Sequence, residues 1–237
     1  MELERLEYQI GKENIEKIKN SKILVIGLGG VGGYVVESLI RSGIENIILV
    51  DADIIEKSNV NRQIIALQST IGMKKVDAFE KRILDINPNV KIKKISEFIT
   101  KENLSILFEK ELDFVIDACD TISTKIAIIE YCSKNNVSII SCMGMGRKLD
   151  PSKISVMDIQ KTSYDPIAKV IRKSLRDKKI NEKIPVVSST EQPLQDHNGI
   201  ISSNSFVPAV AGLTCTSYVI KKIIGGWYAR ITRGRKC

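Results

Sequence analysis

The chain has 237 residues, enough for one large domain or two small ones, and a chain of this size buries about 70% of its unfolded surface without disulfides. Its 43% hydrophobic and 27% charged residues exclude a disordered or fibrous protein. Five cysteines without paired spacing favour a reducing, cytoplasmic setting, and the charged start argues against a secretory signal. The single histidine, His197, excludes a multi-histidine metal site, and we expect it on an exposed loop.

Positive charge is concentrated in the second half of the chain. The formal net charge is +8, and residues 147–183 hold eleven Lys/Arg against five Asp/Glu. Residues 221–237 add six Lys/Arg and no acid. A concentrated positive charge of this kind favours a polyanionic partner.

The first half alternates short apolar runs with helical periodicity. This pattern predicts a mostly parallel α/β sheet with helices on both faces. The expected strands are 23–26, 47–50, an edge strand at 90–95, 113–116 and 137–140, and the expected helices lie within 31–40, 76–84 and 122–129.

The second half is less regular. We expect a strand at 154–157, a helix that Asp165 and Pro166 open, and a long loop over 188–205. The apolar stretch 206–220 is too short for a membrane span and predicts a buried helix, with no membrane insertion. We therefore expect one domain over 1–237, with a nucleotide-binding part over 1–150 and a basic C-terminal lobe over 151–237 that contains the loop.

A glycine-rich turn follows the first strand and opens the first helix. Its residues are Gly27, Leu28, Gly29, Gly30, Val31 and Gly32. Glycines let the backbone approach a phosphate, and a helix N-terminus presents free N–H groups to it. Asp51 ends the second strand, where a Rossmann-type acid binds ribose hydroxyls. A dinucleotide oxidoreductase fits these features equally well.

Charged residues beyond Asp51 favour phosphate chemistry over hydride transfer. Arg62 and Lys75 follow closely, and cations stabilise the charge that builds on a departing pyrophosphate. Asp120 follows a later strand and offers a carboxylate for Mg²⁺, which prefers one or two carboxylates plus phosphate oxygens. We therefore expect ATP and Mg²⁺ as cofactors.

The motifs together resemble the adenylating superfamily of ThiF-like and ubiquitin-activating-like enzymes. They are GxGGVG, DxD at Asp51 and Asp53, SNxNRQ with Asn59 and Arg62, TxGxxK with Lys75, and DACD with Asp120. The resemblance implies a Rossmann-like fold in which these residues bind ATP. It also implies a homodimer in which Arg5 reaches the partner's ATP.

Segments of the second half resemble one subfamily, the tRNA threonylcarbamoyladenosine dehydratases. They are SCMGMGRKLDP from Ser141, DIQKT from Asp158, DPIA from Asp165 and VPAVAGL from Val207. This resemblance implies that ATP adenylates the substrate carboxylate, that the carbamoyl group then attacks internally, and that AMP and pyrophosphate leave. Glu191 matches a family position in the long loop over 188–205, which we call the crossover loop. Its role does not follow from the sequence.

A tRNA substrate would explain the basic regions, because phosphate attraction to Lys and Arg is largely independent of sequence. The candidate phosphate contacts are Lys169, Arg172, Lys173 and Arg176, with Arg230, Arg233 and Arg235 of the tail, and Tyr164 and Trp227 are candidates for stacking on bases. The alternative is a solvated helix face and a disordered tail.

Three other functions stay open. The nearest is an adenylyltransferase that activates the C-terminal glycine of a ubiquitin-like sulfur carrier, although its relatives usually carry CxxC pairs for zinc. This chain has no CxxC, so we expect no zinc. A nicotinamide-dependent oxidoreductase and a non-catalytic nucleotide- or RNA-binding protein are less favoured. A sulfur-transfer or redox protein partner remains open.

Overall fold

The computed structural model describes residues 3–108, 111–195 and 201–225. Seven strands form one sheet in the order β3-β2-β1-β4-β5-β7-β6, and all neighbours are parallel except β6 and β7. The strands are β1 Lys22–Ile26, β2 Asn46–Val50, β3 Lys91–Ile95, β4 Phe114–Asp117, β5 Ile139–Cys142, β6 Ile154–Asp158 and β7 Pro185–Ser189. The helices are α1 Glu4–Ile10, α2 Lys12–Asn20, α3 Gly32–Arg41, α4 Lys75–Ile86, α5 Ile122–Lys134, α6 Pro166–Asp177 and α7 Val207–Ile224.

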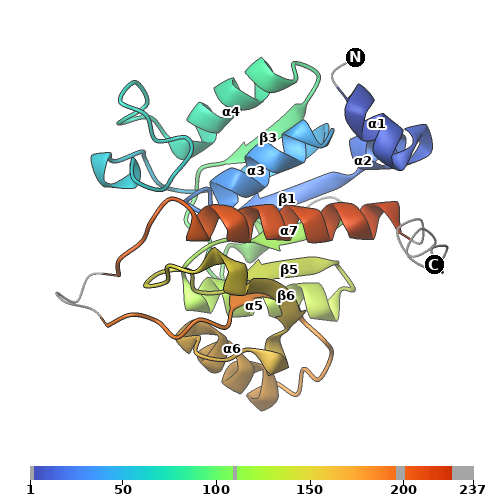
Figure 1. Ribbon diagram of the computed structural model, residues 1–237. Helices are drawn as coiled ribbons and strands as arrows, with labels where there is room; N and C mark the ends of the chain where they lie inside the picture. The colour runs from blue at the N-terminus through green and yellow to red at the C-terminus, as the bar shows by residue number, and fades with distance from the viewer. Residues whose placement is uncertain (1–2, 109–110, 196–200, 226–237) are drawn as a thin grey trace, which may run out of the picture.

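Each face of the sheet has its own hydrophobic core. Successive side chains of a strand point to opposite faces, so Ile23 and Val25 of β1 join one core while Leu24 and Ile26 join the other. Helices α2, α3, α4 and α7 pack on the first face, and α5 and α6 pack on the second. The predicted α/β fold with helices on both faces is therefore confirmed (Figure 1).

Helix α7 returns from the second half of the chain to pack against the first half. Its apolar residues Val207, Ala211, Cys215 and Val219 recur every four positions and are buried in the first core. A side chain at Gly212 would come within 2.5 Å of the Val31 carbonyl, so only glycine allows α7 to lie this close to α3. Helix α7 is long and apolar enough to cross a membrane, so the sequence analysis underestimated its length. Its packing in the first core agrees with the predicted buried helix.

The predicted strands and helices are present, with boundaries shifted by up to five residues. The edge strand is β3, whose lysines face solvent, and Asp165 caps the predicted α6 through a 2.9 Å bond from the Ala168 amide. The sequence analysis missed β7, because Pro185 and the two serines that end it have loop composition. Pro185 is tolerated as the first strand residue, and Ser188 and Ser189 are fully buried, so the crossover loop begins only at Thr190. Helices α1 and α2 were also missed.

Candidate active site

A pocket of about 670 Å³ opens at the carboxyl ends of the parallel strands. It lies where the strand order reverses between β1 and β4, the place where open α/β sheets bind ligands. Ten of the eleven residues predicted for ATP binding line it: Gly27, Gly29, Gly30, Val31, Asp51, Asp53, Asn59, Arg62, Lys75 and Asp120. A second cavity, of about 640 Å³, lies at the opposite ends of the strands and is lined by none of these residues.

The eleventh residue, Gly32, lies beneath the glycine turn. A Cβ at Gly32 would lie 1.7 Å from the Gly27 carbonyl oxygen, so the turn can close only over a glycine. Gly27 itself has a φ of 85°, a left-handed conformation that favours glycine. The turn therefore presents the start of α3 to the pocket, as the motif predicts.

Asp51 organises the floor beside this turn. Its carboxylate accepts hydrogen bonds from the amides of Leu28 (2.6 Å) and Asp53 (2.9 Å). Lys75, the first residue of α4, places its Nζ 2.6 Å from Asp53 and 3.6 Å from Asp51. Lys75 is only 4% exposed. Two carboxylates and a buried cation thus lie together at the end of β2.

The segment after β2 supplies three more polar side chains to the pocket. Arg62 donates to the Ser58 carbonyl and to Asn61 Oδ1, both at 2.9 Å. Asn59 is buried and accepts from the Glu56 amide, so it holds the local turn. The sequence analysis assigned no role to Gln63, yet within the described residues its buried Oε1 has no hydrogen-bond partner. A ligand hydroxyl would satisfy that oxygen.

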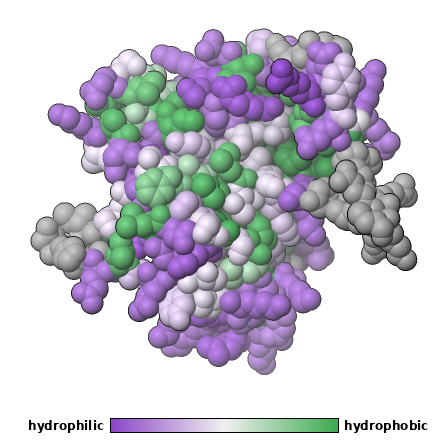
Figure 2. Space-filling view, viewed as in Figure 1, coloured by the Kyte–Doolittle hydropathy of each residue, from purple (hydrophilic) through white to green (hydrophobic). Residues whose placement is uncertain are grey.

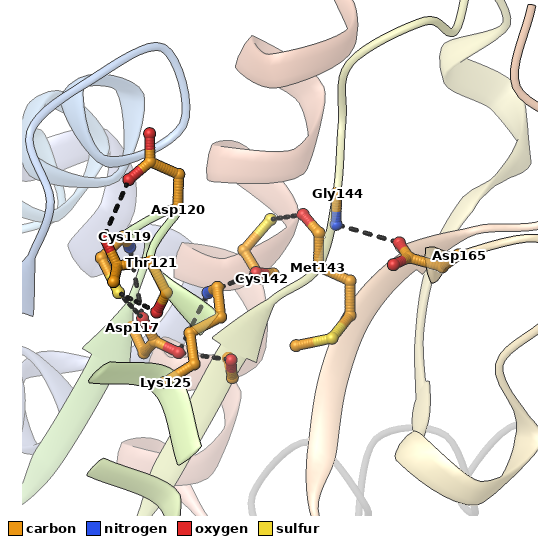
Figure 3. Close-up of polar contacts among 10 residues, drawn as sticks. Asp117, Cys119, Asp120, Thr121, Lys125, Cys142, Met143, Gly144 and Asp165 are labelled. Carbon is orange, nitrogen blue, oxygen red and sulfur yellow. Dashed lines mark hydrogen bonds and ion pairs between the residues drawn. The ribbon is translucent and has the colours of Figure 1, made fainter. Parts of the chain in front are cut away.

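A buried ion pair supports the centre of the pocket. Lys125 donates to Asp117 (3.0 Å) and to the Cys142 carbonyl (2.7 Å), while Ser141 donates to the same Asp117 oxygen (Figure 3). Burial opposes the charge of Lys125, but the attraction of Asp117 outweighs it and raises the pKa of Lys125. The lysine is therefore a cation that ties the ends of β4 and β5 together. The sequence analysis did not single out Lys125, whose partners lie at the ends of two strands.

Asp120 points away from this ion pair (Figure 3). Its side chain is exposed at the pocket, and its hydrogen bond within the described residues is a long one from Thr121 at 3.5 Å. The carboxylate is thus available to a cation bound with a nucleotide. Among the described residues, no three His, Cys, Asp or Glu side chains lie close enough together to hold a metal ion. A metal at Asp120 would therefore depend on phosphate oxygens for further ligands.

Cys119 lines the same pocket, but its thiol is held in the protonated form. Burial first, and then the nearby Asp117 charge, raise the pKa of Cys119 well above its usual value. A thiol must lose its proton to act as a nucleophile. Cys119 is therefore poorly suited to covalent catalysis.

The crossover loop forms the other end of the pocket, against residues 144–150. Glu191 accepts hydrogen bonds from the amides of Leu149 (2.9 Å) and Asp150 (2.9 Å). Asn204 donates to the Lys148 carbonyl at 2.7 Å. The structure thus gives Glu191 the role that the sequence did not reveal, which is to fix the segment after β5.

Phe98 is a further pocket residue that sequence reasoning missed. Its side chain is 60% exposed, although the Asn103 side chain holds its carbonyl and the next residue, Ile99, is buried. A large aromatic ring on an anchored turn offers a flat apolar surface to a base. The only sequence signal was a phenylalanine just after a strand that ends at the pocket.

The structure keeps two groups of predicted residues away from the pocket. Arg5 is exposed on α1, at the opposite end of the molecule from the crossover loop (Figure 1). On α6, Lys169, Lys173 and Arg176 are exposed, whereas Arg172 donates to the carbonyl of Thr162 at 3.2 Å and supports the turn before the helix. His197, Trp227, Arg230, Arg233, Arg235 and Cys237 lie outside the described residues.

Comparisons with known proteins agree with this geometry. The sequence pattern of the ThiF family matches residues 3–232. The tRNA threonylcarbamoyladenosine dehydratase of Bacillus subtilis is 41% identical over 237 aligned positions, which cover 93% of each protein. The crystal structure of the Escherichia coli tRNA N6-threonylcarbamoyladenosine dehydratase in complex with AMP superposes with a TM-score of 0.89 at 30% identity, covering 97% of this chain and 95% of that one. The same E. coli protein has also been solved with ATP.

A relative named as an adenylyltransferase and sulfurtransferase matches less of the chain. The adenylyltransferase and sulfurtransferase UBA4 of Vanderwaltozyma polyspora is 35% identical, but the match covers 57% of this chain and 31% of that protein. The likeness is thus confined to part of the chain.

Proposed function

The chain belongs to the ThiF family, and from that premise we propose that it is an ATP-dependent enzyme that dehydrates threonylcarbamoyladenosine in tRNA. The observation that carries the proposal is the likeness to the B. subtilis dehydratase along almost the whole length of both proteins. The pocket supplies the matching chemistry, because the glycine turn, Asp51 and three charged motif residues line one cavity.

The reaction takes place in two steps. A carboxylate oxygen of the substrate attacks the α-phosphorus of ATP, and pyrophosphate leaves. The carbamoyl group then attacks the activated carbonyl carbon and loses a proton, and AMP leaves with the carboxylate oxygen. The nucleoside has then lost one water, whose oxygen is in AMP.

The chain's own residues bind and orient the nucleotide in these steps. The amides at the start of α3 bind phosphate oxygens, and Asp51 holds the ribose hydroxyls. Arg62 and Lys75 stabilise the charge that develops on pyrophosphate. The positions of these side chains around the pocket support the assignment.

Mg²⁺ fits the exposed carboxylate of Asp120. Magnesium keeps several waters and is held by one or two carboxylates plus phosphate oxygens, so a single acid is sufficient. Bound there, it would neutralise charge on the leaving pyrophosphate. The weak internal contact of Asp120 supports this role.

The direct test measures AMP and pyrophosphate released from ATP and magnesium. Transfer RNA that carries threonylcarbamoyladenosine is compared with the same tRNA lacking it. We expect release only with the modified tRNA. If release instead requires a small ubiquitin-like carrier protein, the protein is the sulfur-carrier adenylyltransferase.

We further propose that the exposed face of α6 contacts tRNA phosphates. Lys169, Lys173 and Arg176 make no hydrogen bond or ion pair within the described residues, and Figure 2 shows hydrophilic side chains gathered where Figure 1 places α6. Binding should weaken by orders of magnitude between about 50 and 200 mM salt if six or more phosphates are contacted. A flat affinity over that range would exclude this face as a phosphate-binding surface.

A homodimer is the third proposal, and Arg5 supports it. Because Arg5 does not line the pocket of its own chain, it can reach a nucleotide only in another copy. Mixing the inactive variants Arg5→Ala and Asp120→Ala should restore activity, since some mixed dimers have one intact site. Mixed dimers without activity would place Arg5 outside the reaction.

The cytoplasm is the compartment that we propose. The cysteines at positions 119, 132, 142 and 215 are all free thiols in the structure, as expected in a reducing environment. The long apolar helix α7 is occupied by core packing. A fluorescent fusion that stayed with the membrane fraction would contradict this proposal.

A further inference from the structure

Five cations line the pocket within the described part of the chain: Arg62, Lys75, Lys125, Arg147 and Lys148. Three of them lie at the nucleotide end or beneath it. Lys75 is bound by Asp53, Lys125 by Asp117, and Arg62 by the turn at Ser58. The two others lie on the segment after β5, which the crossover loop covers.

Lys148 is a buried cation with hydrogen-bonding capacity to spare. It is 3% exposed, and its Nζ donates to the Gly144 carbonyl at 2.6 Å. The nearest carboxylate oxygen belongs to Asp165 and lies 3.8 Å away, beyond hydrogen-bond distance. An ammonium group has three donors, so an arriving anion could accept the remaining ones.

Asp165 forms an ion pair with Lys148, but at 3.8 Å it is too far away to accept a hydrogen bond from it. Its two oxygens are held by backbone amides. One accepts from the Gly144 amide and the other from the Ala168 amide, both at 2.9 Å (Figure 3 shows the first). Burial lowers the pKa of Lys148, the direction expected for a lysine whose charge is poorly solvated. An anion bound beside it would stabilise that charge.

The backbone of this segment is fixed from both sides. Arg147 has a φ of 61°, which is strained for a non-glycine residue. Its amide donates to the Ser202 carbonyl (2.9 Å) and its carbonyl accepts from the Leu194 amide (2.8 Å), so both arms of the crossover loop hold it. Such strain persists only where the surroundings determine the conformation, and functional sites are where it concentrates. Lys148 follows directly and is held through its own carbonyl by Asn204.

We propose that Lys148 binds the carboxylate of the substrate's threonyl group and presents it to ATP. The proposal rests on the proposed function, since it supplies the group that the adenylated carboxylate needs at the end of the pocket away from Asp51. Lys75 lines the same pocket at 4% exposure, so low exposure does not exclude a lysine from the pocket lining. One N–H of Lys148 engages one carboxylate oxygen and leaves the other free to attack.

The test compares Lys148→Met with Lys148→Arg and with the exposed control Lys153→Met. AMP release is followed against the concentration of modified tRNA at saturating ATP. We expect Lys148→Met to lower kcat/KM for the tRNA about 10- to 100-fold, the range for one hydrogen bond to a charged group. Lys148→Arg should recover part of that loss. Lys153→Met should keep the kcat/KM of the unaltered protein, and the Kd for ATP should be the same in all variants.

A binding measurement separates substrate recognition from a structural role. The probes are the free nucleoside threonylcarbamoyladenosine and its methyl ester, which lacks the negative charge. The unaltered protein should prefer the acid, and Lys148→Met should lose that preference. Retention of the preference by Lys148→Met, or by Lys148→Gln if the first variant does not fold, would overturn the proposal. Failure of the proposed function is distinguishable, because the unaltered protein would then release no AMP with modified tRNA.

Discussion

The two ends of the pocket are built in different ways. At the nucleotide end, the contacts lie within short motifs or between adjacent strand ends, such as Asp51 with the amides of Leu28 and Asp53. At the crossover-loop end, Glu191 reaches back 41 or 42 residues to the amides of Asp150 and Leu149. The contact between Leu28 and Asp51 at the first end spans 23 residues, whereas the contact between Leu149 and Glu191 at the second spans 42.

Between the two ends lies the ion pair of Asp117 and Lys125, which joins the ends of β4 and β5. Asp117 ends β4, and the Cys142 carbonyl that accepts from Lys125 ends β5. Because the two ends are built differently, we expect them to have separate roles. Damage to the nucleotide end should affect chemistry with any substrate, damage to the loop end should affect tRNA use, and damage to the shared pair should affect the fold.

The largest expected effect comes from the shared pair. Replacing Lys125 by Met leaves Asp117 as an uncompensated buried charge, which should destabilise the protein by about 3–5 kcal/mol. Urea unfolding measures the change, and the exposed Lys134→Met on the same helix is the control. The double variant Asp117→Leu/Lys125→Met should recover part of the loss. Equal stability of Lys125→Met and the unaltered protein would mean that the pair does not hold the two ends together.

Asp120 tests the nucleotide end alone. Asp120→Asn should lower AMP formation about 10²- to 10³-fold, because it removes the carboxylate proposed to hold Mg²⁺ at the leaving pyrophosphate. Thermal unfolding should be unchanged, since Asp120 is exposed and weakly bonded. Asp177→Asn, at the end of α6, is the control. Normal turnover by Asp120→Asn would remove this residue from the mechanism.

Glu191 tests the loop end. Glu191→Ala leaves two amides without their carboxylate, so we expect kcat/KM for modified tRNA to fall about 10-fold or more while the Kd for ATP is unchanged. The exposed neighbour Gln192→Ala is the matched control. An equal loss of ATP affinity would show that the two ends are not separable.

The smallest effect concerns Glu130, which joins α5 to α6 behind the pocket. Hydrogen bonds from Lys178 and then Lys134 lower the pKa of Glu130 to about 2. A lowered pKa stabilises the fold above the unfolded value of about 4.3, and the contribution disappears as the pH falls through about 2. The side chains of Lys134 and Lys178 are 67% and 35% exposed, so solvent screens their attraction to Glu130. The contribution to stability is therefore no more than about 1 kcal/mol.

The stability difference between the unaltered protein and Glu130→Gln should therefore be present at about pH 6 and shrink towards pH 2. Urea titrations at several pH values measure it, with the exposed Glu182→Gln as control. A difference that grew on acidification would contradict the assigned sign.

The sequence predicted the nucleotide end of the pocket better than the crossover-loop end. The parallel sheet, its edge strand and ten pocket-lining residues were predicted, because glycine turns and strand-end acids are local patterns. Strand β7 was missed because Pro185 and its serines resemble a loop until the chain folds around them. The roles of Lys125, Lys148 and Glu191 did not follow from the sequence, since their partners include backbone groups and residues distant in sequence. Arg172 was assigned to phosphate, yet it bonds the Thr162 carbonyl.

The most direct test of the central claim is the mass of the modified nucleoside. Transfer RNA carrying threonylcarbamoyladenosine is incubated with the protein and magnesium, with and without ATP, then digested and analysed by mass spectrometry. Loss of the mass of one water, only with ATP and not with Asp120→Asn, is the predicted result. An unchanged nucleoside in the presence of ATP and folded protein would contradict the account.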